Sequence, residues 1–455
     1  MGMTAPLRQT LTPERQLEIL SAGTEEILPE GALLERLAQG QRENRPLRVK
    51  QGFDPTAPDI HLGHSVGLRK LGQFQQLGHQ VVLIVGDYTG MVGDPSGRSK
   101  MRPRLSIEEV EANARTYLDQ FHRLIEASPA PPRLPVEVHR NGEWFSQMAF
   151  MDVMRLASEY TVARVLERED FARRYRANQP ISIHELFYPL MQGYDSVAIR
   201  SDVELGGTEQ KFNLIVGRTL QEIHGQPPQI VLTLPILPGL DGVQRMSKTL
   251  GNYIGVTDSP REMYGKVMSL PDFVMPMFWA LVVERTAEES REVERDLGLP
   301  EGSLDRRMVA PGPLPADDLV RSTGPVPLAP RVNPMTVKKR LAGRIVAMYH
   351  GVEAAEGARA DFEAQFSRRE TPAELEEFGR ASVEAAQGHA PAITIVEFLV
   401  ASGIASSKSD ARRLVQQGAV SLDGVKVTDL ATQPGMDQDL VLRVGRKMKR
   451  YRPAS

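Results

Sequence analysis

Two short polar strings, roughly 180 residues apart, have the residue types that bind the phosphates of a nucleotide. The first is His61-Leu62-Gly63-His64, which opens a predicted helix after a strand-like segment. Histidines three residues apart share one helix face, so both imidazoles can reach one ligand. A helix N-terminus favours anions, and Gly63 lets a ligand approach the backbone closely. Alone, such a pair would more often cap the helix or make structural hydrogen bonds.

The second string, Arg245-Met-Ser247-Lys248-Thr249, lies in a glycine-flanked loop after the last strand-like segment. Cations and hydroxyls on a mobile loop can close over a triphosphate and stabilise the charge that develops on a leaving pyrophosphate. Alone, this loop could be a solvated turn. The two strings together, each at the end of a strand, indicate nucleotide chemistry far more specifically than either one.

A third group of polar residues falls on one face of a predicted helix. Tyr188, Gln192 and Asp195 are spaced at i, i+4 and i+7, so they can present donors and an acceptor to one small zwitterion. Tyr188 alone could equally be a core tyrosine. Asp195 among apolar neighbours is harder to explain structurally, because a buried carboxylate without a partner is costly. Asp94 lies in Gly-Asp-Pro-Ser-Gly, which by itself is a good turn.

The elements that would position these residues alternate between strand-like and helical patterns up to about residue 255. The strand-like runs are residues 47–53, 81–86, 136–139 and 230–237, and the clearest helix is 63–77. This alternation predicts an α/β fold with a parallel sheet and ligands at the carboxyl ends of its strands. The later helices are expected at 260–268, 286–296 and 337–349, with an exposed proline-rich insertion at about 297–335. Residues 1–45 are expected to be helical.

Composition narrows the class of protein. A chain of 455 residues suggests about three domains, and 41% apolar with 25% charged residues is typical of globular proteins. No apolar run is long enough to cross a bilayer, the N-terminus lacks a secretory pattern, and there is no cysteine. These features favour a cytoplasmic protein. No clustered histidine or carboxylate pattern predicts a protein-bound metal.

The net charge of −3 hides a basic C-terminal segment. Residues 391–455 contain ten Lys and Arg against six Asp and Glu, and Arg443–Pro453 carries six positive charges. Two short helices are predicted at 393–401 and 407–417, before a hairpin that turns at Asp423-Gly424. This layout indicates an RNA-binding module, although a solvated basic tail would explain the charge alone equally well. The expected RNA-binding side chains are Lys408, Arg412, Arg413, Lys447, Lys449 and Arg450.

The pair HLGH and RMSKT resembles the HIGH and KMSKS motifs of class I aminoacyl-tRNA synthetases. The resemblance implies a Rossmann-type catalytic domain that binds ATP with Mg²⁺, forms an aminoacyl-adenylate and passes the amino acid to the terminal adenosine of tRNA. It assigns His61 and His64, with Thr56, to the α-phosphate transition state. Lys248 and Arg245 would bind the β- and γ-phosphates. The remaining contacts to ATP would come from Gly63, Ser247 and Thr249.

The stretch His184–Asn213 resembles the substrate-binding region of tyrosyl-tRNA synthetases. The resemblance implies that Asp195 accepts a hydrogen bond from the phenol of the substrate. Tyr188, Gln192 and Asp94 would bind its α-ammonium group. The loop Gly-Gly-Thr-Glu-Gln matches the loop that contacts ribose and substrate in the family, here through Gly207, Glu209 and Gln210.

Three positions depart from the family's usual residues. One subgroup of tyrosyl enzymes has a tyrosine, two residues before the glycine of the first motif, that helps to read the substrate hydroxyl. Lys50 stands there, as in the longer bacterial subgroup, and this leaves Asp195 with more of the discrimination. Glu209 replaces the usual aspartate and should shift a ribose contact by one methylene. Arg245 keeps the charge of the usual lysine but not its geometry.

The resemblance covers nearly the whole chain and also implies how the chain is divided into domains. It implies a catalytic domain at 1–250, an α-helical domain of the anticodon-binding type at 251–390, and a small α+β RNA-binding module at 391–455, similar to one named after a small-subunit ribosomal protein. It further implies a homodimer that uses L-tyrosine, ATP and tRNA(Tyr). A tryptophanyl-tRNA synthetase is the near alternative, disfavoured by Gln192, the Gly-Gly-Thr-Glu-Gln loop and the C-terminal module. A catalytically silent RNA-binding paralogue is disfavoured by two intact phosphate motifs.

Overall fold

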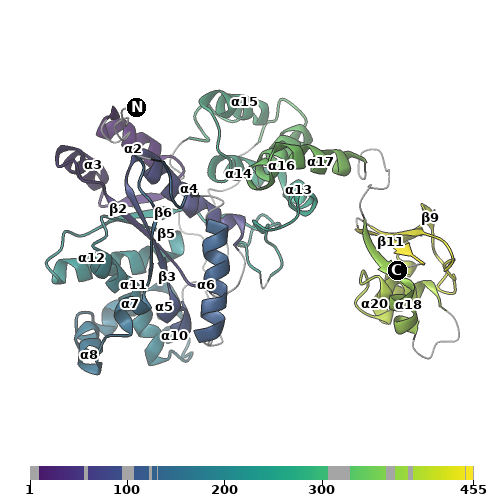
Figure 1. The fold of residues 1–455 in the computed structure, drawn as a ribbon, viewed down its shortest axis with the longest axis horizontal. Helices are drawn as coiled ribbons and strands as arrows, with labels where there is room; N and C mark the ends of the chain where they lie inside the picture. The colour runs from purple at the N-terminus through teal and green to yellow at the C-terminus, as the bar shows by residue number, and fades with distance from the viewer. Residues whose placement is uncertain are drawn as a thin grey trace. The chain divides into compact units, whose positions relative to one another are not determined.

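The structure of the chain, a computed structural model, describes most of its residues. These are 10–55, 60–94, 107–121, 125–130, 132–248, 250–305, 328–364, 375–387, 393–445 and 447–453. The chain separates into two compact units, Met1–Arg359 and Ala360–Ser455 (Figure 1). Among the described residues, no helix is long and apolar enough to cross a membrane.

The first unit is built on a six-stranded sheet in the order β1-β6-β5-β2-β3-β4. Neighbouring strands run parallel, except that β1 pairs antiparallel with β6. The strands are β1 (Glu26–Leu28), β2 (Arg48–Phe53), β3 (Gln80–Val85), β4 (Glu137–Arg140), β5 (Val203–Gly207) and β6 (Ile230–Leu234). The predicted α/β fold with a parallel sheet is confirmed. The expectation that residues 1–45 are helical is wrong at β1, because a three-residue strand has too few positions to show a period.

Later strands are added on both sides of β2, and the point where the strand order reverses forms the crevice for the site. The chain first crosses through α4 (Leu62–Leu77) to β3, and much later crosses from β5 through α12 (Lys211–Ile223) to β6 on the other side. Ligands of such sheets bind outside the carboxyl ends of the strands where the order reverses, which here is between β2 and β5. α4 packs against β2, β3 and β5, and α12 packs against β5 and β6 (Figure 1).

The helices near this crevice have well-defined ends. α4 ends at Gly78, which has a φ of 89° that favours glycine. α11 (Ile183–Ile199) begins with a capping box between Ser182 and Glu185, and it packs along α12. The other helices before β6 are α2 (Pro13–Ser21), α3 (Ala32–Arg42), α5 (Asp87–Val92), α6 (Ile107–Phe121), α7 (Gly142–Phe145), α8 (Phe150–Ser158), α9 (Val162–Val165), α10 (Glu169–Arg176) and η1 (Thr208–Gln210).

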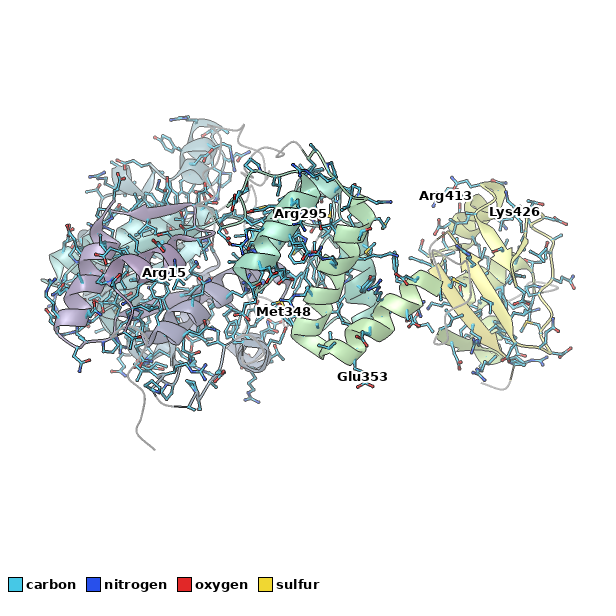
Figure 2. The ribbon with its side chains drawn as sticks, turned by 90° about the horizontal axis from the view of Figure 1, so that it is seen from above. Arg15, Arg295, Met348, Glu353, Arg413 and Lys426 are labelled. Atoms are coloured by element: carbon cyan, nitrogen blue, oxygen red, sulfur yellow. The ribbon has the colours of Figure 1, made fainter. Side chains whose placement is uncertain are left out.

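After β6 the described residues of the first unit form helices and loops without another strand. They are α13 (Pro260–Ser269), η2 (Asp272–Val274), α14 (Met275–Leu281), α15 (Ala287–Leu297), α16 (Pro334–His350) and α17 (Val352–Phe362). The helices expected at 260–268, 286–296 and 337–349 are confirmed. Residues 306–327 of the proline-rich stretch lie outside the described residues. α15 and α16, marked by Arg295 and Met348 in Figure 2, pack side by side.

The second unit has a five-stranded sheet in the order β7-β11-β10-β8-β9, and its described residues also form helices. Its elements are β7 (Glu376–Gly379), α18 (Arg380–Gln387), α19 (Ile395–Ala401), α20 (Lys408–Gln416), β8 (Val420–Leu422), β9 (Val425–Lys426), β10 (Leu440–Val444) and β11 (Lys447–Arg452). The predicted hairpin is confirmed: Asp423 and Gly424 both have positive φ, as a type I′ turn needs. β7 lies before residue 391 and still pairs with β11, so this unit begins earlier than the basic segment.

Candidate active site

A cavity of about 520 Å³ lies at the carboxyl ends of the parallel strands. One group of predicted residues that line it contains two imidazoles and two cations, and a second contains carboxylates, amides and a phenol. The first group is His61, Gly63, His64, Arg245, Ser247 and Lys248, and the second is Asp94, Tyr188, Gln192, Asp195, Gly207, Glu209 and Gln210. Residues that are more than 180 positions apart in the sequence therefore meet in one cavity. Thr56 and Thr249 lie outside the described residues.

The two histidines of the first group cap the start of α4. His61 Nδ1 accepts a hydrogen bond from the Gly63 backbone at 3.2 Å, and the His61 backbone donates to His64 Nδ1 at 3.3 Å. A Cβ on Gly63 would lie 2.9 Å from the His61 ring, so this close turn requires glycine. Both histidines therefore cap the helix, and both also line the cavity.

Both imidazoles are neutral at physiological pH. Burial lowers the pKa of His64 to about 4, and the positive charge of Lys248 acts in the same direction. Burial, together with His64 and Lys248, also holds the pKa of His61 well below its usual value. Because each Nδ1 already accepts a backbone hydrogen bond, the proton of each neutral ring is at Nε2. Both rings can therefore donate to an anionic oxygen in the cavity.

The loop that carries the two cations is held by Asn252, which the sequence analysis did not single out. Its Oδ1 accepts from the Ser247 backbone at 2.8 Å, and its Nδ2 donates to the Arg245 carbonyl at 3.1 Å. The next residues run antiparallel to the segment before α4: the Leu62 backbone donates to Ile254 O at 2.9 Å. These bonds bring the two polar strings of the sequence together.

Asp195 in the second group is buried, with 3% of its surface exposed. Its Oδ1 accepts from the Trp144 indole at 3.0 Å, and its Oδ2 accepts from the Asn141 amide at 3.5 Å. Burial raises the pKa of Asp195 to about 7, while the charge of Lys50 and these hydrogen bonds oppose the rise. Trp144 and Asn141 follow β4 in a segment without any motif. The only signal for them was a polar residue directly after a parallel strand.

Tyr188 combines a core position with a place in the cavity wall. It is buried, and its hydroxyl donates to Asp54 Oδ2 at 2.8 Å. Asp54, at the end of β2, accepts from the Thr89 hydroxyl through its other oxygen at 2.7 Å. The sequence analysis missed Asp54, although it stands between a predicted strand and the first polar string.

An amide, Asn213 on α12, connects the other polar residues of the second group. Its Nδ2 donates to Gln192 Oε1 at 2.9 Å and to Gln210 Oε1 at 3.1 Å. Gln210 in turn donates to Asp94 Oδ2 at 2.7 Å. These bonds gather Asp94, Gln192 and Gln210, which are far apart in the sequence, around one part of the cavity.

Glu209 presents an acceptor to the cavity. Its Oε2 is buried and has no hydrogen-bond partner among the described residues, and burial raises its pKa. A Cβ on Gly207 would collide with Glu209 Oε2, so a side chain there would displace this carboxylate. No group of three His, Asp or Glu residues in the described part of the chain could hold a metal ion.

The predicted RNA-binding side chains of the second unit do not share one face. Lys447 and Lys449 alternate along β11 with Arg450, which points to the opposite side of the sheet. Three of the six are in ion pairs: Lys408 with Glu397, Arg413 with Asp410, and Lys449 with Glu376. Arg413 lies on α20, and Figure 2 labels it together with Lys426 of β9.

Comparisons with known proteins cover both units. A family model described as "tRNA synthetases class I (W and Y)" matches residues 41–303. A second model, "Tyrosine–tRNA ligase SYY-like C-terminal domain", matches residues 374–448. The chain is 47% identical over 440 residues to a protein of Moorella thermoacetica named tyrosine–tRNA ligase, covering 95% of this chain and 94% of that protein. A protein of the same name from Aquifex aeolicus is 43% identical, with 98% and 100% covered.

Solved structures agree on the fold. A C-terminally truncated mitochondrial tyrosyl-tRNA synthetase from Aspergillus nidulans superposes with a TM-score of 0.58 at 18% identity, over 78% of this chain and 94% of that one. A tyrosyl-tRNA synthetase from Archaeoglobus fulgidus, solved with L-tyrosine, gives 0.54 at 21% identity, over 76% and 99%. Because a family model matches more than half of the sequence and relatives of 43–47% identity match nearly all of it, the chain belongs to the class I aminoacyl-tRNA synthetases and, within them, to the tyrosine–tRNA ligases.

Proposed function

We propose that the chain activates L-tyrosine with ATP to form tyrosyl-adenylate and pyrophosphate, and then transfers tyrosine to the 3′-terminal adenosine of tRNA(Tyr). One observation carries this proposal. A single cavity combines a histidine-capped helix start and a cationic loop with a buried row of Tyr188, Gln192 and Asp195. The first set suits a triphosphate and the second suits a small zwitterion with a polar side chain.

The phosphate chemistry falls to the first group. His61 and His64 donate Nε2–H to the α-phosphate as the tyrosine carboxylate attacks it, and Thr56 is assigned to the same step by the family resemblance. Lys248 and Arg245, with Ser247 and Thr249, bind the β- and γ-phosphates and stabilise the leaving pyrophosphate. Donors that meet charge developing in the transition state contribute to the rate, not merely to binding.

Mg²⁺ would bind together with ATP. The described residues offer no metal cluster, so the ion would be held mainly by the phosphates and water, which is its usual habit in nucleotide sites. When bound, it would neutralise charge on the triphosphate.

Recognition of tyrosine falls to the second group. The carboxylate of Asp195 accepts from the substrate phenol, and about two of its four acceptor sites remain beside Trp144 and Asn141. Tyr188, Gln192, Gln210 and Asp94 surround the α-ammonium group. The ribose of the nucleotide lies against Gly207 and Glu209, where an acceptor oxygen is already buried.

The second unit would bind tRNA through its phosphate backbone. Arg412 and Lys447 are exposed, while Lys408, Arg413 and Lys449 can exchange their carboxylate partners for phosphates. Recognition by shape and backbone charge needs no base-specific contact. We also propose a catalytic domain at 1–250 and a helical domain that follows it, in a cytoplasmic protein. The RNA-binding module then includes β7 and begins before residue 391, because β7 pairs with β11.

We further propose a homodimer that uses the exposed face of α8. Phe150 and Met151 expose 76% and 61% of their surfaces, and Met154 lies one turn further on. Large apolar side chains grouped on one exposed face are typical of an interface. Phe150→Lys should therefore convert dimer to monomer in light scattering, whereas Val352→Lys, at an exposed valine of α17, should not. A wild-type monomer, or a dimeric Phe150→Lys variant, would contradict this assignment.

Aminoacylation tests the function directly. The full chain should attach radiolabelled tyrosine to purified tRNA(Tyr) and leave tRNA(Trp) uncharged with tryptophan. Tryptophan charging would favour the near alternative. Binding of tRNA without any charging would favour a silent RNA-binding paralogue, a reading that the neutral, correctly oriented histidines and the nearby cations oppose.

A further inference from the structure

A buried pair of opposite charges lies behind the second group of cavity residues. Lys50 on β2 and Glu204 on β5 are direct neighbours in the parallel register of these strands. Both side chains are 0% exposed, and Lys50 Nζ lies 3.2 Å from Glu204 Oε1. Neither residue lines the cavity. The pair therefore cannot act on a substrate by contact.

Lys50 directs all its hydrogen-bonding capacity into the protein. Besides Glu204, Nζ donates to the Ser196 hydroxyl at 2.7 Å and to the Gln192 carbonyl at 3.1 Å. An ammonium group has three donors, so no donor remains for a ligand. Two of these bonds join one turn of α11, the turn that presents Gln192 and Asp195 to the cavity. Lys50 fixes the position of that turn relative to β2.

Glu204 holds the same turn from the other side. Its Oε1 accepts from Gln192 Nε2 at 3.3 Å, and its Oε2 accepts from the Ser196 hydroxyl at 2.9 Å and from the Gln229 amide. A Cβ on Gly217 would lie 2.6 Å from that amide, so the network has no spare room. Glu204 thereby orients the Gln192 side chain, whose Oε1 is held by Asn213.

The pair also acts on Asp195 through space. The groups that face this carboxylate are Lys50 from β2, Glu204 from β5, and Trp144 and Asn141 from the segment after β4. Burial raises the pKa of Asp195, Lys50 opposes that rise, and Glu204 adds to it more weakly. The net effect of the pair favours the charged carboxylate, which is the stronger acceptor for a phenol.

We propose that Lys50 and Glu204 are positioning residues of the amino-acid subsite, which fix the Gln192–Ser196 turn of α11 so that Gln192 and Asp195 are held in place to read the substrate. The proposal rests on the tyrosine-activating function proposed above. It explains how a lysine can occupy a position where a substrate-reading side chain would be expected: Lys50 acts from behind the cavity wall. A buried ion pair adds little net stability compared with apolar residues, so a role in specificity accounts for it better than a role in stability.

The test compares the wild type with the neutral double variant Lys50→Met/Glu204→Gln in tyrosine-dependent ATP–pyrophosphate exchange. Removing both charges avoids leaving one ion buried alone. Loss of these contacts to the tyrosine subsite should raise the KM for tyrosine about tenfold or more and leave the KM for ATP unchanged. The kcat/KM ratio of tyrosine over phenylalanine should fall by a similar factor. The pH at which kcat/KM for tyrosine reaches half of its maximum should increase, because Lys50 no longer opposes the effect of burial on the pKa of Asp195.

A matched control removes a different buried pair that is also anchored on α11. Arg174 and Glu185 are both nearly buried and bond each other, and their other hydrogen bonds go to Pro180 and Ser182, neither of which lines the cavity. Arg174→Met/Glu185→Gln should leave the KM for tyrosine and the pH inflection at their wild-type values. If the Lys50/Glu204 double variant does not fold, Ser196→Ala removes two bonds of the same network, one to Lys50 and one to Glu204. It should raise the KM for tyrosine several-fold, again without change in the KM for ATP.

The possible results separate the two proposals. A selective rise in the KM for tyrosine with an upward pH shift, absent from the control, supports the role of the pair. Wild-type values in a folded double variant, or in Ser196→Ala, overturn it and leave the proposed function intact. Equal losses for tyrosine and ATP would also overturn it, since they indicate a general structural defect. A wild-type chain without tyrosine-dependent exchange overturns the proposed function itself.

Discussion

Replacing Asp195 by asparagine should lower the preference for tyrosine over phenylalanine. The carboxylate has Trp144 Nε1 at 3.0 Å and Asn141 Nδ2 at 3.5 Å, and in the proposed function its remaining lone pairs accept from the substrate phenol. Asparagine keeps the shape but has only one oxygen, so its NH₂ group must face one of these donors or the phenol. Phenylalanine has no hydroxyl, so its binding loses no such hydrogen bond when Asp195 is replaced.

The magnitude follows from the type of bond that is lost. A hydrogen bond to a charged group contributes about 1.5–3 kcal/mol, which corresponds to about a 10- to 150-fold decrease in the kcat/KM ratio of tyrosine over phenylalanine. The assay is ATP–pyrophosphate exchange with each amino acid, and the KM for ATP should stay unchanged. Asp437→Asn, at a side chain that is 98% exposed, provides a matched control. A ratio that changes less than about threefold would place the reading of the hydroxyl elsewhere.

The same carboxylate predicts a pH dependence with a definite sign. Because burial raises the pKa of Asp195 to about 7, kcat/KM for tyrosine should rise as pH increases through that value and then level off. Asp195→Asn should lack this step. The buried charge also costs stability above pH 7, so the variant should have a higher Tm than the wild type at pH 8. That difference should shrink as pH falls from 7 toward the ordinary carboxyl pKa of 3.8, because below that value the carboxyl is protonated in both the folded and unfolded states.

Three further predictions concern the other parts of the molecule. Lys248→Ala should slow adenylate formation in stopped-flow by about 10²- to 10³-fold with nearly unchanged tyrosine binding, and a slowing below about fivefold would contradict its role. Deleting residues 375–455, which removes β7 together with the rest of its sheet, should preserve pyrophosphate exchange but sharply reduce charging at limiting tRNA, and equal charging would contradict this role. Binding of tRNA by the full chain should weaken steeply as the salt concentration rises. Because burial lowers the pKa of His64 to about 4, stability should fall by up to about 3 kcal/mol as pH drops from 6.5 toward 4, and His64→Gln should flatten that urea-denaturation profile.

The sequence predicted the parts of the site that local patterns encode. The helix after the first polar string was expected at 63–77 and runs from Leu62 to Leu77, because its apolar residues repeat with helical spacing and its start has capping residues. Tyr188, Gln192 and Asp195 were expected on one helix face and do line one cavity. Their spacing is a property of a single helix, so no tertiary information was needed.

The missed residues all depend on contacts between distant segments. Trp144 reaches Asp195 across 51 residues, and Asp54 accepts from Tyr188 across 134 residues. The partner of Lys50 is set by the register between β2 and β5, which a single sequence does not specify. Lys50 was recognised as a departure from the family, but only the register shows that it points into the protein.

Amino-acid-dependent ATP–pyrophosphate exchange by the full chain tests whether this one cavity joins tyrosine to ATP. The assay would be run with tyrosine, tryptophan and phenylalanine, each at matched concentrations with ATP and Mg²⁺ and without tRNA. Labelled pyrophosphate should enter ATP rapidly with tyrosine and stay near background with the other two. Exchange that is supported by tryptophan at least as well as by tyrosine, or by none of the three, would contradict the account.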